Sequence, residues 1–342
     1  MRNLYLTSIL FLLFLIPQIN AQSHLQKGWE IISSGGLDFA GMLRINPTIG
    51  AGDSQISFGG AFSSTANYNS SKTSWTNSIS LNYGVQKTGF TNLSNPNVKV
   101  PFQKSIDQLR INSKFGYRSS ILYPGARFLY TVDFSFLSQL TKTYEGNFAK
   151  KPDLALGAGN SVISKFLSPA TTHISAGIDY RPIDQLSIYY SPAALKFVIV
   201  LDDNIADSII IDDAGNPASL HGNPILRDEN GVINGFKNVD SQLGSLLRIS
   251  YNDFFAEKRF ILNSSISLYS NYLNRPEKID VDWTNEIGIK IIEGLQISLW
   301  SNLFYDFDIP VQKTENLRII EGSFTRGISF SQQLLIKYSK TF

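Results

Sequence analysis

The strongest constraint on the fold of this chain is a two-residue alternation of hydropathy between Ile279 and Ile291. Every second residue is apolar apart from one Asn, and the residues between them are polar or Gly. Successive side chains of a β-strand point to opposite faces, so this stretch is predicted to be a strand with one apolar and one charged face. At about 3.3 Å per residue, it is long for a soluble strand but suits a tilted strand that crosses a membrane. The apolar row is Ile279, Val281, Trp283, Asn285, Ile287, Ile289 and Ile291, and the polar row is Asp280, Asp282, Thr284, Glu286, Gly288 and Lys290.

The same alternation recurs along the chain and predicts about twelve strands, with ten or fourteen as alternatives. Strand ends carry an error of about two to four residues when they are read from pattern alone. One predicted strand, 186–201, changes phase at Ser191-Pro192, and a proline at such a switch indicates a β-bulge. The predicted strands are 36–46, 54–68, 74–86, 106–118, 126–140, 172–181, 186–201, 241–252, 258–273, 279–291, 295–308 and 324–342.

The long links between these strands all fall on one side, and only short links fall on the other. Bacterial outer-membrane barrels have this arrangement, with short periplasmic turns, longer external loops and an even number of strands. We therefore predict an all-β fold, an antiparallel up-and-down transmembrane β-barrel, and expect tyrosines near the strand ends to mark the membrane interfaces. An exported β-sandwich also alternates, but it needs less apolar surface and rarely keeps strands this long. The odd-numbered links, which include every link longer than seven residues, are 47–53, 87–105, 141–171, 202–240, 274–278 and 309–323, and the even-numbered links are 69–73, 119–125, 182–185, 253–257 and 292–294.

The two ends of the chain fit an exported protein. Residues 1–21 are predicted to be a signal peptide, with Arg2 before an apolar run and a small residue, Ala21, at the cleavage site. Residues 22–35 are predicted to form a periplasmic arm, and 36–342 the barrel. The last strand ends on Phe342, in phase with its apolar residues, which predicts contact with the barrel-insertion machinery. The expected location is the outer membrane of a Gram-negative bacterium.

Composition excludes several kinds of site. The 342 residues include no Cys, which rules out disulfides, thiolate metal sites and a Cys nucleophile. A net charge of +2, without a Lys/Arg cluster, gives no reason to expect a nucleic-acid partner. No cofactor is expected.

Several segments together resemble a Bacteroidota family of outer-membrane β-barrels of unknown function (DUF3078-like). The resemblance implies a barrel in the outer membrane and supplies no catalytic residues. The segments that carry it are Trp75–Gly84, Lys104–Lys114, Phe136–Gln139, Ser164–Pro169, Gly177–Pro182, Tyr190–Pro192, Val281–Trp283 and Tyr305–Asp306.

Charges on the polar faces supply the candidate site. In a closed ring of twelve strands, strands 106–118 and 279–291 are the fourth and the tenth, so they are expected to stand opposite each other. A basic wall would then face an acidic wall across a narrow lumen, and lining charge and diameter set pore selectivity. The alternative is that these charges pair with one another and fill the interior, because burying a lone charge is costly. The basic wall comprises Arg110, Lys114, Arg118 and the neighbouring Arg127, and the acidic wall Asp280, Asp282 and Glu286.

We expect a non-enzymatic barrel, either a narrow channel for small polar solutes or an accessory subunit of an envelope assembly. One alternative is a barrel-embedded lipid hydrolase that uses His173 with a nearby Ser, although many serines on every strand make such proximity expected by chance. Another is an external binding protein that acts through loop 202–240, whose clustered carboxylates lack the spacing of a calcium loop. The expected partners are outer-membrane lipid, lipopolysaccharide, the insertion machinery and an unknown envelope protein.

Overall fold

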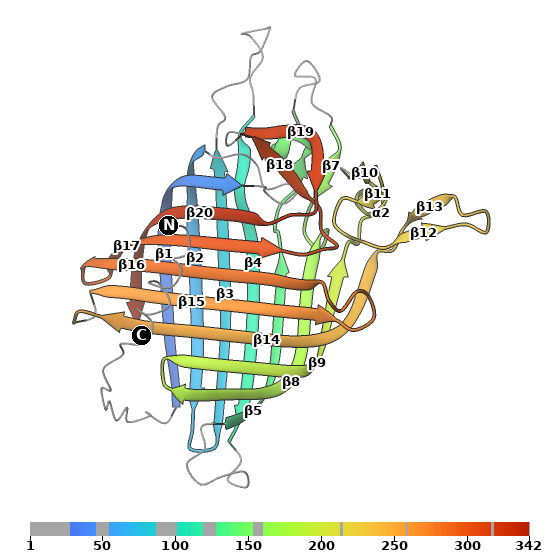
Figure 1. The fold of residues 1–342 in the computed structure, drawn as a ribbon. Helices are drawn as coiled ribbons and strands as arrows, with labels where there is room; N and C mark the ends of the chain where they lie inside the picture. Colours follow the sequence, from blue (N-terminus) through green and yellow to red (C-terminus); the bar gives the residue numbers. More distant parts are fainter. Residues whose placement is uncertain are drawn as a thin grey trace, which may run out of the picture.

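The computed structural model describes residues 28–45, 55–86, 101–118, 128–152, 160–212, 215–257, 259–315 and 318–341. Within this part, twelve antiparallel strands close into one barrel, in which each strand pairs with its neighbour along the chain and the last pairs with the first (Figure 1). In ring order the strands are β1 (Gly28–Ile45), β2 (Gln55–Asn69), β3 (Thr73–Gln86), β4 (Gln103–Tyr117), β5 (Phe128–Ser138), β8 (Ala170–Ile183), β9 (Leu186–Ile199), β14 (Val239–Phe255), β15 (Phe260–Asn271), β16 (Ile279–Ile292), β17 (Leu295–Tyr305) and β20 (Ser329–Thr341).

The fold class predicted from the alternation is confirmed, including the count of twelve strands. One boundary was wrong, because residues 28–35 belong to β1 and not to a separate arm. The Ser-Ser-Gly-Gly run that suggested a break is tolerated within the strand: the hydroxyls of Ser33 and Ser34 hydrogen-bond those of Ser64 and Ser63 on β2, at 2.9 and 2.5 Å. The predicted signal peptide, the rest of the arm and Phe342 lie outside the described residues.

The bulge predicted at Ser191-Pro192 is present. The register of β9 shifts there against both of its neighbours, β8 and β14. The Ser191 hydroxyl donates to the carbonyl oxygens of Ala176 and Ala193, at 2.7 and 2.9 Å, and so occupies carbonyls that the interrupted ladder would leave open. Opposite the bulge, a Cβ on Gly177 would lie 2.1 Å from the Tyr190 carbonyl oxygen, so the backbone approach requires Gly.

The long links lie at one end of the barrel, as predicted, and several are folded. The link between β5 and β8 contains β6 (Thr143–Tyr144), η1 (Glu145–Asn147) and β7 (Val162–Ser164). The link between β17 and β20 contains the hairpin of β18 (Val311–Glu315) and β19 (Arg318–Thr325). The link between β9 and β14 contains α2 (Asp203–Ala206) and the hairpins of β10 (Ile209–Ile211) with β11 (Pro217–Ser219) and of β12 (Ile225–Arg227) with β13 (Ile233–Phe236). None of the described helices is long and apolar enough to cross a membrane.

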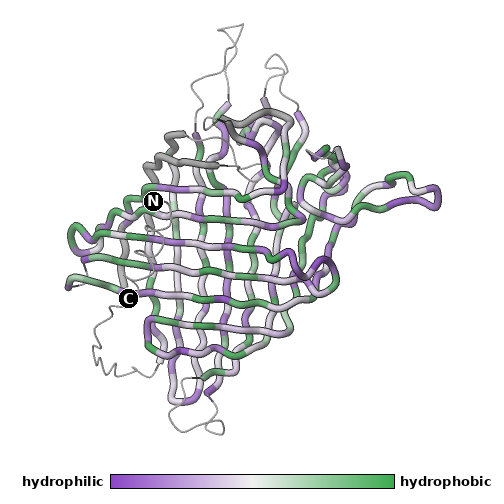
Figure 2. The backbone as a smooth tube through the Cα atoms, in the orientation of Figure 1, coloured by the Kyte–Doolittle hydropathy of each residue, from purple (hydrophilic) through white to green (hydrophobic). Residues whose placement is uncertain are grey.

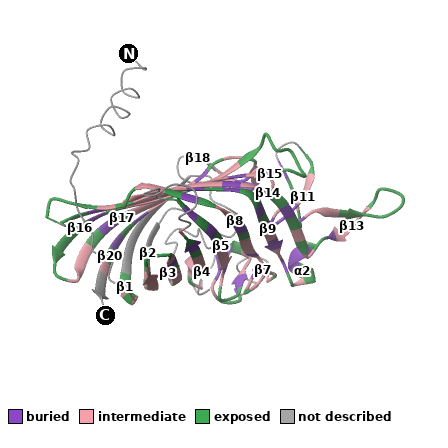
Figure 3. Ribbon diagram, turned by 90° about the horizontal axis from the view of Figure 1, so that it is seen from below, coloured by how far each residue is buried: buried purple, intermediate pink, exposed green. Residues whose placement is uncertain are grey.

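The barrel is flattened, with two walls whose strands cross at a steep angle. In Figure 1 the strands β14 to β17 and β20 run across the view in front of β1 to β4, which run from top to bottom. Figure 3 shows the same two groups of strands as opposite walls, seen from below. Sheet twist produces this crossing when a sheet closes on itself. Side chains from opposite walls are therefore able to meet inside.

The apolar rows face outward. Along β16, Trp283 and Ile287 are 41% and 54% exposed, whereas Asp282 and Glu286, each one residue before them, are half-buried on the inner side. Figure 2 shows the same alternation, with green apolar segments interrupted by white and purple ones along each strand. Such exposed apolar surface over a whole barrel is far more than a soluble monomer carries.

Aromatic rings gather on the outer face near the short-turn end. Trp29 on β1 contacts the rings of Tyr68 and Trp75, at centroid distances of 5.4 and 5.8 Å. On β5 and β8, Phe128 stacks on Tyr180 at 4.6 Å. An aromatic girdle of this kind is typical of a membrane interface.

Candidate functional site

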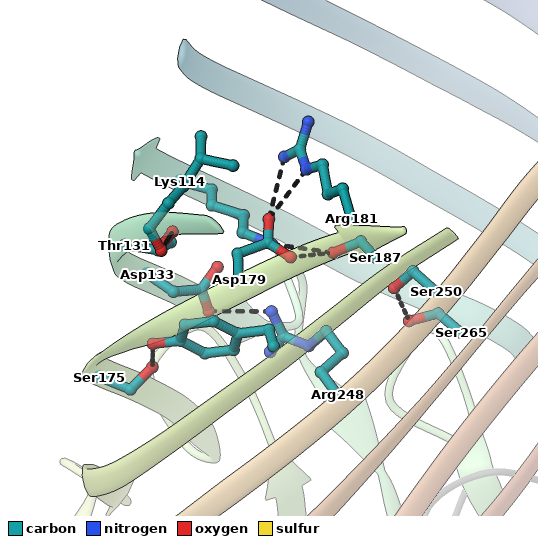
Figure 4. A network of polar contacts seen from close by, with 12 residues as sticks. Lys114, Thr131, Asp133, Ser175, Asp179, Arg181, Ser187, Arg248, Ser250 and Ser265 are labelled. Carbon is teal, nitrogen blue, oxygen red and sulfur yellow. Dashed lines mark hydrogen bonds and ion pairs between the residues drawn. The ribbon is translucent and has the colours of Figure 1, made fainter. Parts of the chain in front are cut away.

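The lumen is crossed near its middle by an ion pair between separate regions of the wall. Arg248 on β14 donates from Nη1 to Asp133 Oδ2 on β5, at 2.9 Å. Two strands, β8 and β9, separate these positions in the ring. The Asp133 side chain is only 3% exposed, so the contact lies deep in the interior (Figure 4).

A second network fills the lumen toward the short-turn end. Asp179 on β8 is fully buried and binds Lys114 Nζ from β4 and Arg181 Nη2, both at 3.0 Å. Ser187 on β9 donates its hydroxyl to the other Asp179 oxygen at 2.5 Å. Figure 4 shows Lys114, Arg181 and Ser187 converging on this carboxylate. The Lys114 ammonium also lies 5.1 Å from the centroid of the Tyr189 ring.

A third network lies inside the barrel toward the long links. Lys196 on β9 is 5% exposed and donates from Nζ to Asp280 Oδ2 at 3.0 Å and to Asp306 Oδ2 at 2.7 Å. Asp280 lies on β16, which β14 and β15 separate from β9 in the ring, and Asp306 follows the end of β17. A single buried lysine therefore joins three regions of the wall.

The residues of the basic wall predicted on β4 have different environments in the structure. Lys114 pairs with Asp179, as described above. Arg110 points into the lumen, is half-buried, and makes no ion pair with a carboxylate in the described part of the chain. Arg118 lies just beyond β4, where its backbone N–H donates to the Lys72 carbonyl at 2.7 Å. Arg127 is outside the described residues.

The acidic wall predicted on β16 has closer partners than the residues of β4. Asp280 binds Lys196. Asp282 accepts a hydrogen bond from the Asn302 amide at 2.6 Å. Glu286 Oε1 accepts from Lys337 Nζ at 2.7 Å. The inward charges are therefore largely neutralised within the wall or by short crossings of the lumen.

Sequence reasoning missed the partners that complete these networks. The missing residues are Asp133, Asp179, Lys196, Arg248, Asp306 and Lys337. Their inward positions follow from the same two-residue alternation, so the phase of each strand was the available signal. Lys196 was obscured because the bulge reverses the phase of β9 just before it.

His173, the residue of the hydrolase alternative, points into the lumen from β8. Its ring lies edge-on to Tyr269 at 6.0 Å, and the positive charges of Lys196, Arg248 and Arg110 act on it. Its Nδ1 atom is buried without a hydrogen-bond partner among the described residues, so no Ser hydroxyl of that part is activated through this atom. The geometry gives the hydrolase no support, because catalysis needs a hydroxyl within hydrogen-bond reach of the base.

The acidic link between β9 and β14 uses its carboxylates to hold its own fold. Asp202 pairs with Lys165 and accepts from the Asn204 N–H at the start of α2. Asp207 accepts from the Phe236 N–H, and Asp228 accepts from the Val232 N–H within a turn. The structure brings no three potential metal ligands together within its described ranges.

The same link has a small apolar core and, separately, a buried histidine, His221. Val200, Ile205 and Ala206 pack together with Val162 from the preceding link. His221 Nε2 lies 2.8 Å from the Ile163 carbonyl oxygen. Burial lowers the pKa of His221 to about 4, so the ring is neutral at pH 7 and donates to this carbonyl.

The fold and its lining define a class of protein. This chain is a closed, twelve-stranded antiparallel β-barrel with an apolar outer surface and a polar lumen crossed by ion pairs.

Comparisons with known proteins give a partial family match. The model of a family described as a protein of unknown function (DUF3078) matches residues 48–144. This range includes the resembling segments on β3, β4 and β5 and excludes those further along the chain. The chain matches no curated protein.

Several solved barrels overlap the chain over most of its length at low identity. One is the COG4313 outer membrane channel from Pseudomonas putida F1, with a TM-score of 0.39, 8% identity, and coverage of 94% of this chain and 100% of that one. Another is a TodX monoaromatic hydrocarbon channel mutant, with a TM-score of 0.35, 12% identity, and coverage of 94% and 92%. The translocator domain of autotransporter NalP from Neisseria meningitidis has a TM-score of 0.35, 7% identity, and coverage of 92% and 89%.

Proposed function

We propose that this chain spans the outer membrane of a Gram-negative bacterium and forms a narrow channel for small polar solutes. The observation that carries the proposal is the sidedness of the closed ring, with apolar rows outside and hydrogen-bonding side chains inside. In a closed barrel the backbone N–H and C=O groups of every strand are hydrogen-bonded to a neighbouring strand, as lipid requires. The polar lining gives a passing solute hydrogen-bonding partners.

The ion pairs that cross the lumen support a narrow passage and argue against a general porin. Small barrels have interiors that side chains nearly fill, and wide aqueous channels occur nearer sixteen strands. Arg248 with Asp133, and Lys196 with Asp280, connect strands that are not neighbours in the ring. Solutes would therefore pass beside these bridges.

Conductance in planar bilayers tests the channel. Replacing both partners of the central bridge with small residues (Asp133→Ser with Arg248→Ser) removes the crossing without leaving one charge alone. We expect small discrete currents from the wild type, and an increase of about twofold or more in the double variant. A wild type and a double variant that are equally silent would contradict the proposal.

The candidate charge walls lead to a separate proposal, about the selectivity of the channel between anions and cations. In the part of the chain that the structure describes, Arg110 is an inward cation without an ion-pair partner, so it is the wall residue whose charge is free to act on a passing ion. Arg110→Gln is expected to lower the preference for anions over cations, as measured by the reversal potential in a salt gradient. An unchanged reversal potential would remove Arg110 from the selectivity of the channel.

A projecting hairpin supports binding to an external partner as a second candidate. The hairpin of β12 and β13 extends away from the barrel (Figure 1), and Leu226 and Val232 on it are 40% and 61% exposed. Replacing residues 226–232 with a short Gly-Ser turn should abolish capture of such a partner and leave the barrel folded. If capture survives this replacement, the hairpin is not the binding element.

A further inference from the structure

Three cationic side chains surround the ring of Phe307 at the end of the barrel that carries the long links. From the ring centroid, the Arg275 guanidinium carbon lies at 4.9 Å, the Lys278 ammonium at 5.2 Å and the Arg326 guanidinium carbon at 4.5 Å. Phe307 follows β17, Arg275 and Lys278 lie between β15 and β16, and Arg326 lies between β19 and β20. We call these four residues the Phe307 cluster.

The positive charge of the cluster is poorly compensated. Because all three cations lie within 5.2 Å of one centroid, no two of them are further apart than about 10 Å, and they repel one another. Contact with the electron-rich face of the ring offsets part of this repulsion, but the ring carries no net charge. Among the described residues neither Arg275 nor Lys278 has a carboxylate at ion-pair distance, and Arg326 has only a long contact, 3.9 Å, to Asp212.

The carboxylates nearest in sequence are held by other groups or lie apart from the cluster cations. Asp306 is held by Lys196 inside the lumen. Burial and the neighbouring Asp306 raise the pKa of Asp308, whereas the charges of Lys196 and Arg326 act in the opposite direction, so Asp308 compensates part of the Arg326 charge. Glu277 is exposed and, although it lies between Arg275 and Lys278 in sequence, it makes no ion pair with either among the described contacts. Arg275 and Lys278 are therefore the two cations of the cluster without an ion-pair partner among the described residues.

The backbone holds two of the cations in place. Arg275 has a φ of +50°, which is costly for a residue with a Cβ, and the Lys278 N–H donates to the Arg275 carbonyl at 2.8 Å. Such conformations persist where the surroundings impose them, and they often occur at ligand sites. Both side chains are exposed at this turn.

We propose that the Phe307 cluster binds the phosphate group of a lipid headgroup in the adjacent leaflet. A phosphate offers several acceptor oxygens and up to two negative charges, and guanidinium groups bind it through paired N–H donors. Lysine adds a point charge to the same anion. The lipid source rests on the proposed membrane location, whereas the phosphate chemistry rests on the cluster alone.

Native mass spectrometry of the full chain in detergent tests the site with three probes. The probes are short-chain phosphatidic acid, short-chain phosphatidylcholine and inorganic phosphate. Wild-type protein should bind phosphatidic acid about tenfold or more tightly than phosphatidylcholine, whose own choline cation competes with the cluster. Arg275→Gln with Lys278→Gln should weaken phosphatidic acid binding about tenfold, a loss of about 1.4 kcal/mol.

A matched control removes two exposed cations from another long link. Arg227→Gln with Lys237→Gln causes the same change in net charge on the link between β9 and β14, and it should alter binding by less than about twofold. Equal losses in the two double variants, or a wild type that does not distinguish phosphatidic acid from phosphatidylcholine, would overturn the proposal.

Two further outcomes distinguish failure of the lipid source from failure of the phosphate site, and failure of the site from failure of the channel. Inorganic phosphate that binds as tightly as phosphatidic acid would support the phosphate site and overturn the lipid headgroup as its source. Conductance of the Arg275→Gln, Lys278→Gln protein reports on the channel independently, because the cluster lies outside the lumen networks. A silent barrel that binds phosphatidic acid would refute the channel and retain the site.

Discussion

At the scale of single residues, the paired charges inside the barrel have more influence on stability than the exposed ones. Asp133 and Asp179 are 3% and 0% exposed, and each depends on a cation from a strand that is not its neighbour. A buried carboxylate that loses its partner must be neutralised or hydrated at considerable cost. These bridges therefore tie separate parts of the wall together as well as narrowing the lumen.

Removing one partner of the central bridge should destabilise the barrel more than removing both. Arg248→Ala leaves Asp133 buried and unpaired, and we expect a loss of about 3 kcal/mol in the free energy of unfolding. Asp133→Asn with Arg248→Gln should lose less, because no charge is stranded. Urea unfolding in detergent, followed by tryptophan fluorescence, gives both values, and Arg110→Ala serves as a control without an ion pair. A double variant less stable than Arg248→Ala would contradict this account of the bridge.

Acid should open the link between β9 and β14 through His221. The folded link holds this imidazole neutral, with a pKa of about 4, whereas an exposed histidine has a pKa near 6.5. The open form therefore binds more protons below pH 6.5, and the stability of the link falls as the pH drops from 6.5 to about 4, by about 3 kcal/mol in total.

Limited proteolysis within residues 200–238 measures this opening. Cleavage of the wild type should accelerate between pH 6.5 and pH 4 with a protease that is active across this range. His221→Gln should have weaker pH dependence, since glutamine can still donate to the Ile163 carbonyl. Equal pH dependence in both proteins would assign the opening to another group.

At the scale of elements, the bulge in β9 determines how the barrel wall is assembled around the networks. It returns the apolar residues of β9 to the outer face, and it brings Lys196 to the inner face, where it meets Asp280 and Asp306. The tight approach of β8 to this bulge requires Gly177.

Gly177→Ala should disrupt this approach. The added Cβ would lie 2.1 Å from the Tyr190 carbonyl oxygen, so the strands must move apart, at an expected cost of about 1–3 kcal/mol. Gly60→Ala is the matched control in a strand, because its nearest atom would be 3.9 Å away. Urea unfolding midpoints compare the two, and similar midpoints would contradict the role given to Gly177.

The alternation predicted most of the elements but only part of the site. Period-two patterns predict inner and outer faces directly, and they assigned Lys114, Asp280 and Glu286 to the polar face, where each has an ion-pair partner. Pairing across a lumen depends on how strands tilt and on how far the barrel flattens, and neither quantity is encoded in one strand. The Asp133 and Arg248 bridge therefore required the assembled ring.

The start of β1 shows a second reason why sequence alone did not predict every strand boundary. Small polar residues and glycines from Ser33 to Gly36 suggest a linker by composition. In the barrel Ser33 and Ser34 face Ser64 and Ser63 of β2, and the hydroxyls pair across the strands. Only the partner strand reveals that this run belongs to the sheet.

At the scale of the whole molecule, the central claim is that the outer surface meets lipid and the lumen meets water. The chain has no native Cys, so single cysteines can be labelled with an environment-sensitive fluorophore at chosen positions. Ile287 and Thr284 lie on the same strand, three residues apart and on opposite faces.

The most direct test uses Ile287→Cys and Thr284→Cys in vesicles that contain brominated lipid chains. A label at position 287 should be strongly quenched by the brominated chains and protected from aqueous iodide. A label at position 284 should respond in the opposite way, with weak quenching by the lipid and access to iodide. If the label at 287 is quenched by iodide and the label at 284 by brominated lipid, the assignment of the two faces is contradicted.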